Sequence, residues 1–173
     1  MRLFIALELP LAVVGELVGW RDSVLVMKEG LRPVPPESMH VTLAFLGERA
    51  PSSVDALRGA LEAVAGTGAA PLALGSPSWL PRRRPGVMVV AIEDDDDLLH
   101  KTRGLLLSAL HRAIGFEPER RAFFPHVTVA RVRRGSKVRP TPLDSPSAVE
   151  FSGERLTLFE SAGGYRLLHS VQL

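Results

Sequence analysis

The sequence predicts an α+β fold of two lobes, in which antiparallel strands of both lobes face each other across a central cleft and helices lie outside. Three observations predict it. The pattern His-Val-Thr-aliphatic occurs twice, at residues 40–43 and 126–129. Its histidines are 86 residues apart in a chain of 173, so each half carries one copy. Segments with strand and helix periodicity also follow one another in a similar order in both halves.

The expected elements follow from hydrophobic periodicity and from glycine, proline and serine positions. In the first half we expect a strand at 2–9, a helix at 11–29, a loop at 33–36, a strand at 39–46, a helix from Ser52 or Ser53 to about 64, and a strand near 72–74 followed by a Pro/Arg-rich loop. In the second half we expect a strand at 87–92, a helix opened by 93–97 and ending near 115, a strand at 123–132, a loop at 136–147, and strands at roughly 155–160 and 165–172.

Length and composition indicate one domain, residues 1–173, whose lobes we expect at roughly 1–80 and 81–173 with termini that can cross between them. Apolar residues make up 46% of the chain and charged residues 23%, which is typical of globular proteins. Without cysteine there is no disulfide framework, and no apolar run approaches the ~20 residues of a membrane span. We therefore expect a cytoplasmic monomer that does not contact membranes.

The repeated motif places chemistry on one face of each strand. Side chains at i and i+2 of a strand share a face, so His40 projects with Thr42 and His126 with Thr128. An imidazole has a pKa near 6.5, so two of them can act as one base and one acid near neutral pH. A threonine hydroxyl beside each ring can donate a hydrogen bond to an anionic oxygen. Such a set suits a phosphodiester that is attacked on one side and released on the other.

The same residues also allow a purely structural role or a metal site. A single histidine on a strand is usually a packed residue without chemistry, but two copies with the same spacing favour a site. A zinc site is disfavoured, because the chain has no cysteine, no His-x-x-x-His and no acidic residue inside either motif. Asp94–Asp97 suggest magnesium, but acidic residues at a helix start serve as caps, which is the interpretation we adopt. We therefore expect neither metal nor other cofactor.

Basic residues are concentrated around the second motif although the net charge is only +2. Residues 120–139 contain seven Arg and Lys and no acidic residue, and residues 82–84 form a second cluster. Exposed basic runs are most often simply solvated. Beside a candidate phosphodiester site, they more plausibly attract a polyanion such as RNA.

At these residues the chain resembles the 2H phosphoesterases, and more closely the RNA 2′,3′-cyclic phosphodiesterases, also called 2′-5′ RNA ligase-like proteins. The matching segments are residues 2–7, 35–43, 45–48 and 125–131, with a weaker similarity at 156–161 and 164–165. The resemblance implies metal-independent hydrolysis of a 2′,3′-cyclic phosphate at an RNA end to a 2′-phosphate, with 2′-5′ RNA ligation as a further activity. The substrate would be such an RNA or a cyclic nucleotide.

By analogy with that family, His126 is expected to be the general base on water and His40 the general acid on the leaving 3′-oxygen. The sequence alone leaves these two roles interchangeable, because the motifs are nearly identical. Thr42 and Thr128 would bind the non-bridging oxygens. Arg131 is a further phosphate ligand, but strict strand alternation turns it away from His126 unless the strand twists or bulges. Phe45 is expected either to stack on the terminal base or to pack in the core.

Three rival functions remain open at this point. The first is a module that binds RNA ends without catalysis, which would not need both histidines. The second is RNA ligation as the main activity. The third is a 2H enzyme that acts on another cyclic or 2′-5′-linked nucleotide. Retention of His and Thr in both motifs argues against the first.

Overall fold

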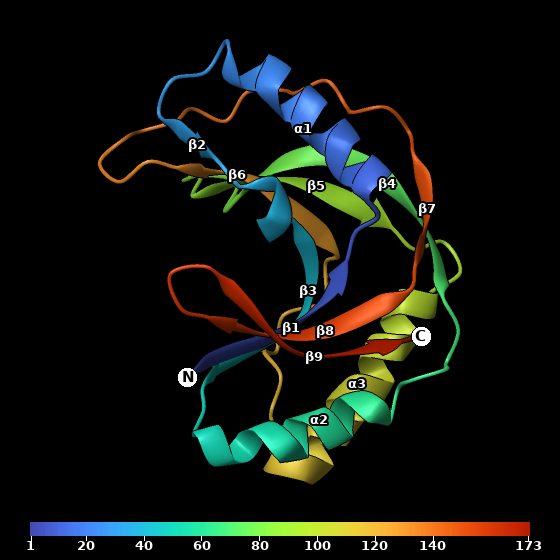
Figure 1. Ribbon diagram of the computed structural model, residues 1–173. Helices are drawn as coiled ribbons and strands as arrows, with labels where there is room; N and C mark the ends of the chain where they lie inside the picture. The colour runs from blue at the N-terminus through green and yellow to red at the C-terminus, as the bar shows by residue number, and fades with distance from the viewer.

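The computed structural model describes residues 1–173, which form one antiparallel nine-stranded sheet and three α-helices (Figure 1). The strand order is β7-β4-β5-β6-β3-β1-β8-β9, and β2 pairs with β6 off this path. In chain order the elements are β1 (Arg2–Glu8), α1 (Leu11–Leu25), β2 (Leu31–Pro33), β3 (His40–Glu48), α2 (Val54–Glu62), β4 (Ala70–Leu80), β5 (Val87–Glu93), α3 (Leu98–Ile114), β6 (His126–Val132), β7 (Glu150–Gly153), β8 (Arg155–Ser161) and β9 (Tyr165–Gln172). Short 3-10 helices occupy Pro36–Ser38 and Pro51–Ser53. The predicted α+β class is confirmed.

The two motif strands meet at the centre of the sheet. Strands β3 and β6 are joined there by one aligned pair, Val41 opposite Val127. Strand β1 pairs with the outer side of β3, and β5 pairs with the outer side of β6. The order strand, helix, strand is thus repeated as β1–α1–β3 and β5–α3–β6. Each half of the sheet takes strands from both halves of the chain, because β1 and β3 lie beside β8 and β9.

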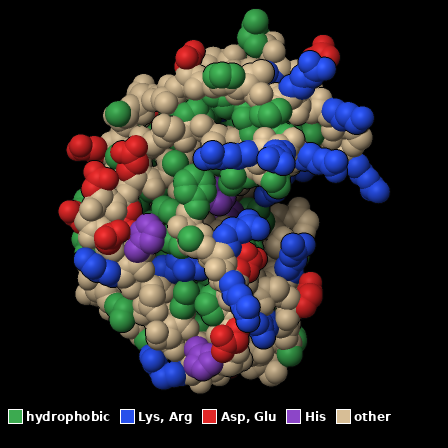
Figure 2. All heavy atoms as spheres, turned by 180° about the vertical axis from the view of Figure 1, so that it is seen from behind, with side chains coloured by type: hydrophobic (Ala, Val, Ile, Leu, Met, Phe, Trp, Pro, Cys, Tyr) green, Lys and Arg blue, Asp and Glu red, His purple; other side chains and the backbone are tan.

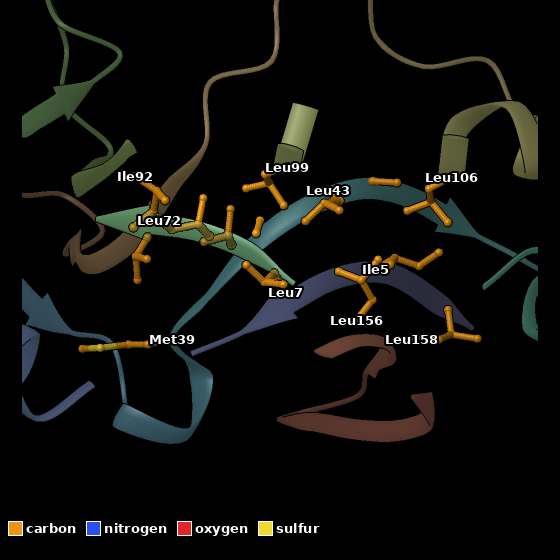
Figure 3. Close-up of a cluster of buried hydrophobic side chains, with 14 of the residues drawn as sticks. Ile5, Leu7, Met39, Leu43, Leu72, Ile92, Leu99, Leu106, Leu156 and Leu158 are labelled. Carbon is orange, nitrogen blue, oxygen red and sulfur yellow. The ribbon is translucent and has the colours of Figure 1, made fainter. Parts of the chain in front are cut away.

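The helices lie on the outer sides of the two halves of the sheet (Figure 1). Helix α1 lies over the half with β4, β5 and β6, and it buries Val13, Leu17 and Arg21 at helical spacing. Helices α2 and α3 pack together below the half with β1 and β8. Figure 3 shows Leu99 of α3 beside Leu43 of β3 and Leu106 of α3 farther along the same strand, with Ile5 of β1 nearby. None of the three helices is long and apolar enough to cross a membrane.

Three parts of the fold differ from the prediction. The loop expected at 33–36 begins with a short strand, β2, whose Pro33 is tolerated because β2 lies beside only one partner. Strand β7 was not predicted, because only Gly153 of its four residues is buried and no alternation is visible. Strand β4 runs on to Leu80 through the region expected as a Pro/Arg-rich loop, with a register shift at Pro77.

Candidate active site

The two motifs lie side by side on one face of the sheet. The valines at their centres, Val41 and Val127, face each other and are fully buried. Extending this antiparallel register by one residue places each histidine opposite the threonine of the other motif. The histidines and threonines are half-buried, as expected for side chains on the opposite face from the valines. The duplicated sequence therefore builds one site from two strands.

A cavity of about 600 Å³ is lined by all six side chains that the sequence predicts for the site. They are His40, Thr42, Phe45, His126, Thr128 and Arg131. Polar side chains from other elements complete the wall, namely Arg2, Ser38, Glu119, Ser161 and Tyr165. Glu119 is the single carboxylate among them, so the basic and hydrogen-bonding groups that line this cavity suit an anion.

A bulge in each motif strand brings Phe45 and Arg131 to the cavity. In β3 the aligned pairs with β1 pass from Thr42 to Ala44, which leaves Leu43 without a partner, and a second shift after Phe45 skips Leu46. In β6 the pairs with β5 pass from Thr128 to Ala130, which leaves Val129 as the extra residue. The extra residue shifts the alternation by one, so a side chain three positions after the threonine returns to the cavity side. The bulge that Arg131 needs in order to face the cavity is therefore present.

A carbonyl two residues earlier in the chain contacts each imidazole. Nδ1 of His126 lies 2.7 Å from the oxygen of Phe124, and a backbone hydrogen bond at Ser38 acts on His40. The network thus assigns the proton of His126 to Nδ1, which donates to the carbonyl and leaves Nε2 as an acceptor. Nε2 of His40 lies 3.1 Å from Thr42 Oγ1. Each ring can therefore exchange a proton at Nε2.

The protonation of His40 is set by its surroundings. Burial, which outweighs an opposing backbone hydrogen bond at Ser38, lowers the pKa of His40 from 6.5 to about 4. The positive charge of Arg131 acts in the same direction as burial. At pH 7, and with no anion in the cavity, His40 is consequently neutral. A bound anion would counter the charge of Arg131 and favour the protonated ring.

A second, mostly apolar cavity of about 510 Å³ adjoins the first and shares Thr42, Phe45, Glu119 and His126 with it. Phe45 and Phe124 line it and are 68% and 44% exposed, which is unusual for phenylalanine. Arg103 fixes its wall, since Nε donates to the Leu43 carbonyl at 2.8 Å. The Arg103 guanidinium also lies 4.5 Å from the centre of the Phe123 ring. Aromatic surface is therefore available next to the motif histidines.

Of the acidic residues before α3, only Asp94 acts as the expected helix cap, whereas Asp97 at the N-cap position makes no capping hydrogen bond with its side chain. The Asp94 carboxylate accepts hydrogen bonds from the backbone N–H groups of Leu99 and His100 at 3.1 and 2.9 Å. His100 Nδ1 lies 2.6 Å from the same carboxylate, and these contacts lower the pKa of Asp94 although its burial acts in the opposite direction. Asp94, Asp97 and His100 are the one group close enough together to hold a metal ion. None of them lines the motif cavity, and the motif histidines belong to no such group.

The comparison with known proteins agrees with this geometry. Residues 7–89 match the family described as LigT like Phosphoesterase. A curated relative, the RNA 2′,3′-cyclic phosphodiesterase of Aeropyrum pernix, is 32% identical over 70% of this chain and 68% of its own length. The chain belongs to the LigT-like phosphoesterases. The RNA 2′,3′-cyclic phosphodiesterase of Escherichia coli (strain K12) is 28% identical over 82% of this LigT-like phosphoesterase and 77% of the relative. The crystal structure of E. coli LigT complexed with 3′-AMP has a TM-score of 0.75 at 26% identity and covers 99% of this chain and 97% of that chain.

Two side chains that surround His40 in this LigT-like phosphoesterase were not selected from the sequence. The ring of Phe4 stacks on His40 with centroids 5.0 Å apart, and Tyr165 meets it edge-on at 5.3 Å. Together they contribute to the burial that lowers the pKa of His40. Arg2 and Phe4 are two positions apart in the predicted first strand, so their side chains share a face. This spacing could have identified Phe4 from the sequence. Tyr165 comes from the far end of the chain, and only the pairing of β8 with both β1 and β9 brings it there.

Proposed function

We propose that this LigT-like phosphoesterase hydrolyses RNA 2′,3′-cyclic phosphate ends to 2′-phosphomonoesters, with His40 and His126 as the acid/base pair. The observation that carries the proposal is the pairing of two His/Thr motifs in one cavity, where each imidazole can use Nε2. The names of the curated relatives, RNA 2′,3′-cyclic phosphodiesterase, support the choice of substrate. We further propose that it acts in the cytoplasm, as a monomer and without a metal.

The chemistry requires one proton to be removed and one to be delivered. A water oxygen attacks phosphorus, and the bond between phosphorus and the 3′-oxygen breaks. In the proposed assignment, His126 takes a proton from the water and His40 gives one to the 3′-oxygen, which leaves a 3′-hydroxyl and a 2′-phosphate. Each proton transfer of this kind contributes about 10²- to 10⁴-fold to the rate.

The lowered pKa of His40 adds a condition to this assignment. His40 is neutral in the free protein at pH 7, so it must gain its proton when the anionic substrate enters. The charge of the cyclic phosphate offsets that of Arg131 and raises the pKa of the ring. Once protonated, an imidazole of low pKa gives up its proton readily to the departing oxygen. The opposite assignment, with His40 as the base, is favoured by its neutral form and is the alternative to be tested.

The remaining cavity side chains fit the two ends of such a substrate. Thr42 and Thr128 would donate hydrogen bonds to the non-bridging oxygens, and Arg131 would balance their charge. Phe45 would stack on the terminal base, because it is 68% exposed and lines both the motif cavity and the apolar cavity beside it. Exposure to this degree disfavours its alternative interpretation as a core residue.

Product analysis tests the proposed function. An oligoribonucleotide with a 2′,3′-cyclic phosphate end, a 2′,3′-cyclic mononucleotide and a 2′-5′-linked dinucleotide are incubated separately with the protein. We expect the first to yield a 2′-phosphomonoester end. Binding of the oligonucleotide without turnover would support a module that only binds RNA ends. Turnover of only the dinucleotide would support a 2H enzyme of different specificity. Joining to a 5′-hydroxyl RNA in the same assay measures the proposed ligase activity.

A further inference from the structure

One edge of the cleft is lined by arginines that have no acidic partner. Arg131 of β6 lies opposite Arg32 of β2 and, on its other side, opposite Val87 of β5. The hairpin loop that precedes Val87 carries residues 82–84, which are three consecutive exposed arginines. We call these five residues the basic rim. Figure 2 shows Lys and Arg side chains in a row along the upper edge of the hollow.

The positive charge of the basic rim is not balanced by a neighbouring carboxylate. No member of the rim forms a salt bridge, in contrast to Arg21, Arg58, Arg155 and Arg166, which each pair with a carboxylate. Five uncompensated charges beside a cavity repel one another and attract counterions. A partner that carries regularly spaced negative charges would release these counterions on binding, which is favourable at low salt.

The two motif strands carry chemically different side chains at equivalent positions of the repeat. Phe45 and Arg131 each follow the bulge of their motif strand by the same number of residues, but one is aromatic and the other cationic. Phe45 lines both the motif cavity and the apolar cavity, whereas Arg131 lines only the motif cavity and is paired with Arg32 of the basic rim. An RNA end has the same asymmetry, because an aromatic base projects from the terminal ribose while the chain continues through phosphates. One orientation of RNA matches both sides.

We infer that the RNA chain leaves the cavity along the basic rim, so that phosphates upstream of the cyclic end contact Arg82, Arg83 and Arg84. The terminal base then lies on the side of Phe45 and Phe124. This inference rests on the proposed function and adds to it a direction for the bound strand. If the strand binds in this direction, the protein hydrolyses cyclic phosphates at the ends of oligonucleotides more efficiently than cyclic mononucleotides.

The test compares two substrates on three proteins. The substrates are a single-stranded octaribonucleotide with a 2′,3′-cyclic phosphate end and the 2′,3′-cyclic mononucleotide of the same terminal base. The proteins are the wild type, the variant R82Q/R83Q/R84Q and a matched control, R58Q/K101Q/R112Q, which removes the same number of charges from α2 and α3. The value of kcat/KM is measured between 50 and 200 mM salt.

We expect the rim variant to lose activity only on the octamer. Three phosphate contacts to a single strand give a slope of about −2 for log kcat/KM plotted against the logarithm of the salt concentration. From 50 to 200 mM salt, kcat/KM of the wild type for the octamer should therefore fall about 20-fold more than that of the rim variant. The mononucleotide should be hydrolysed equally, within about twofold, by all three proteins. The control should match the wild type on both substrates.

Two results would overturn the inference and leave the proposed function intact. One is equal activity of the rim variant and the wild type on the octamer at every salt concentration. The other is an equal loss on octamer and mononucleotide, which would mean that the three arginines act on the cavity itself. A wild-type protein that hydrolyses neither substrate would instead refute the proposed function, and the inference would fall with it.

Discussion

The half-buried imidazole of His40 should make the stability of the protein depend on pH in a way that one substitution removes. Its pKa is about 4 in the folded protein and 6.5 in its ordinary state, so the unfolded chain binds the proton more tightly. Stability from this group is complete above pH 6.5 and is lost as the pH falls toward 4. A difference of two to three pKa units corresponds to about 3 kcal/mol in the free energy of unfolding.

The measurement is urea unfolding of the wild type and His40→Gln at several pH values from 7 to 4, followed by tryptophan fluorescence. Other groups titrate in both proteins, so the difference between the two curves isolates His40. Between pH 7 and 4 we expect the wild type to lose about 3 kcal/mol more than His40→Gln. His111→Gln, which removes an exposed histidine, is the control and should follow the wild type. Parallel curves for the wild type and His40→Gln would refute the reasoning.

Three further predictions concern the site and its support. Activity on a 2′,3′-cyclic phosphate should survive EDTA; a loss on chelation that one added metal restores would show that a Lewis acid takes part. Thr42→Val and Thr128→Val should each lower kcat about 10²- to 10³-fold with little change in folding, as measured by steady-state kinetics and circular dichroism. Gly153→Ala should lower the free energy of unfolding in urea by about 1–3 kcal/mol, because the added Cβ would lie 2.9 Å from both Leu7 Cδ2 and Leu72 Cδ1. An unchanged midpoint of urea unfolding would show that the core adapts freely at this position.

The sequence sufficed for the parts of the structure that depend on local pattern. The motif strands, the three helices and the cap at Asp94 follow from periodicity and from helix-start signals within a few residues. That the two motifs share one cavity followed from their repetition, because a duplicated unit places equivalent strands together. The side of the strand on which Arg131 lies could be stated only conditionally. A bulge depends on pairing with β5, which the sequence of β6 alone does not specify.

What the sequence did not predict depends on contacts between distant segments. Tyr165 and Phe4 are 161 residues apart, yet their rings lie 4.9 Å from each other beside His40. Their placement requires β8 to pair with both β1 and β9, which no local pattern states. The low pKa of His40 is a consequence of this packing, so the motif sequence alone does not predict it. Strand β7 was missed because it is short and mostly exposed.

The most direct test of the account is a leaving-group experiment on the two histidines. His40→Ala and His126→Ala are each assayed with a 2′,3′-cyclic phosphate, where we expect losses of several orders of magnitude, and with a phosphodiester whose leaving group needs no proton. We expect the second substrate to restore activity to His40→Ala far more than to His126→Ala, because only the acid becomes dispensable. Restoration of His126→Ala alone, or of both equally, would contradict the assigned roles, and full activity of either variant on the cyclic phosphate would contradict the two-histidine mechanism itself.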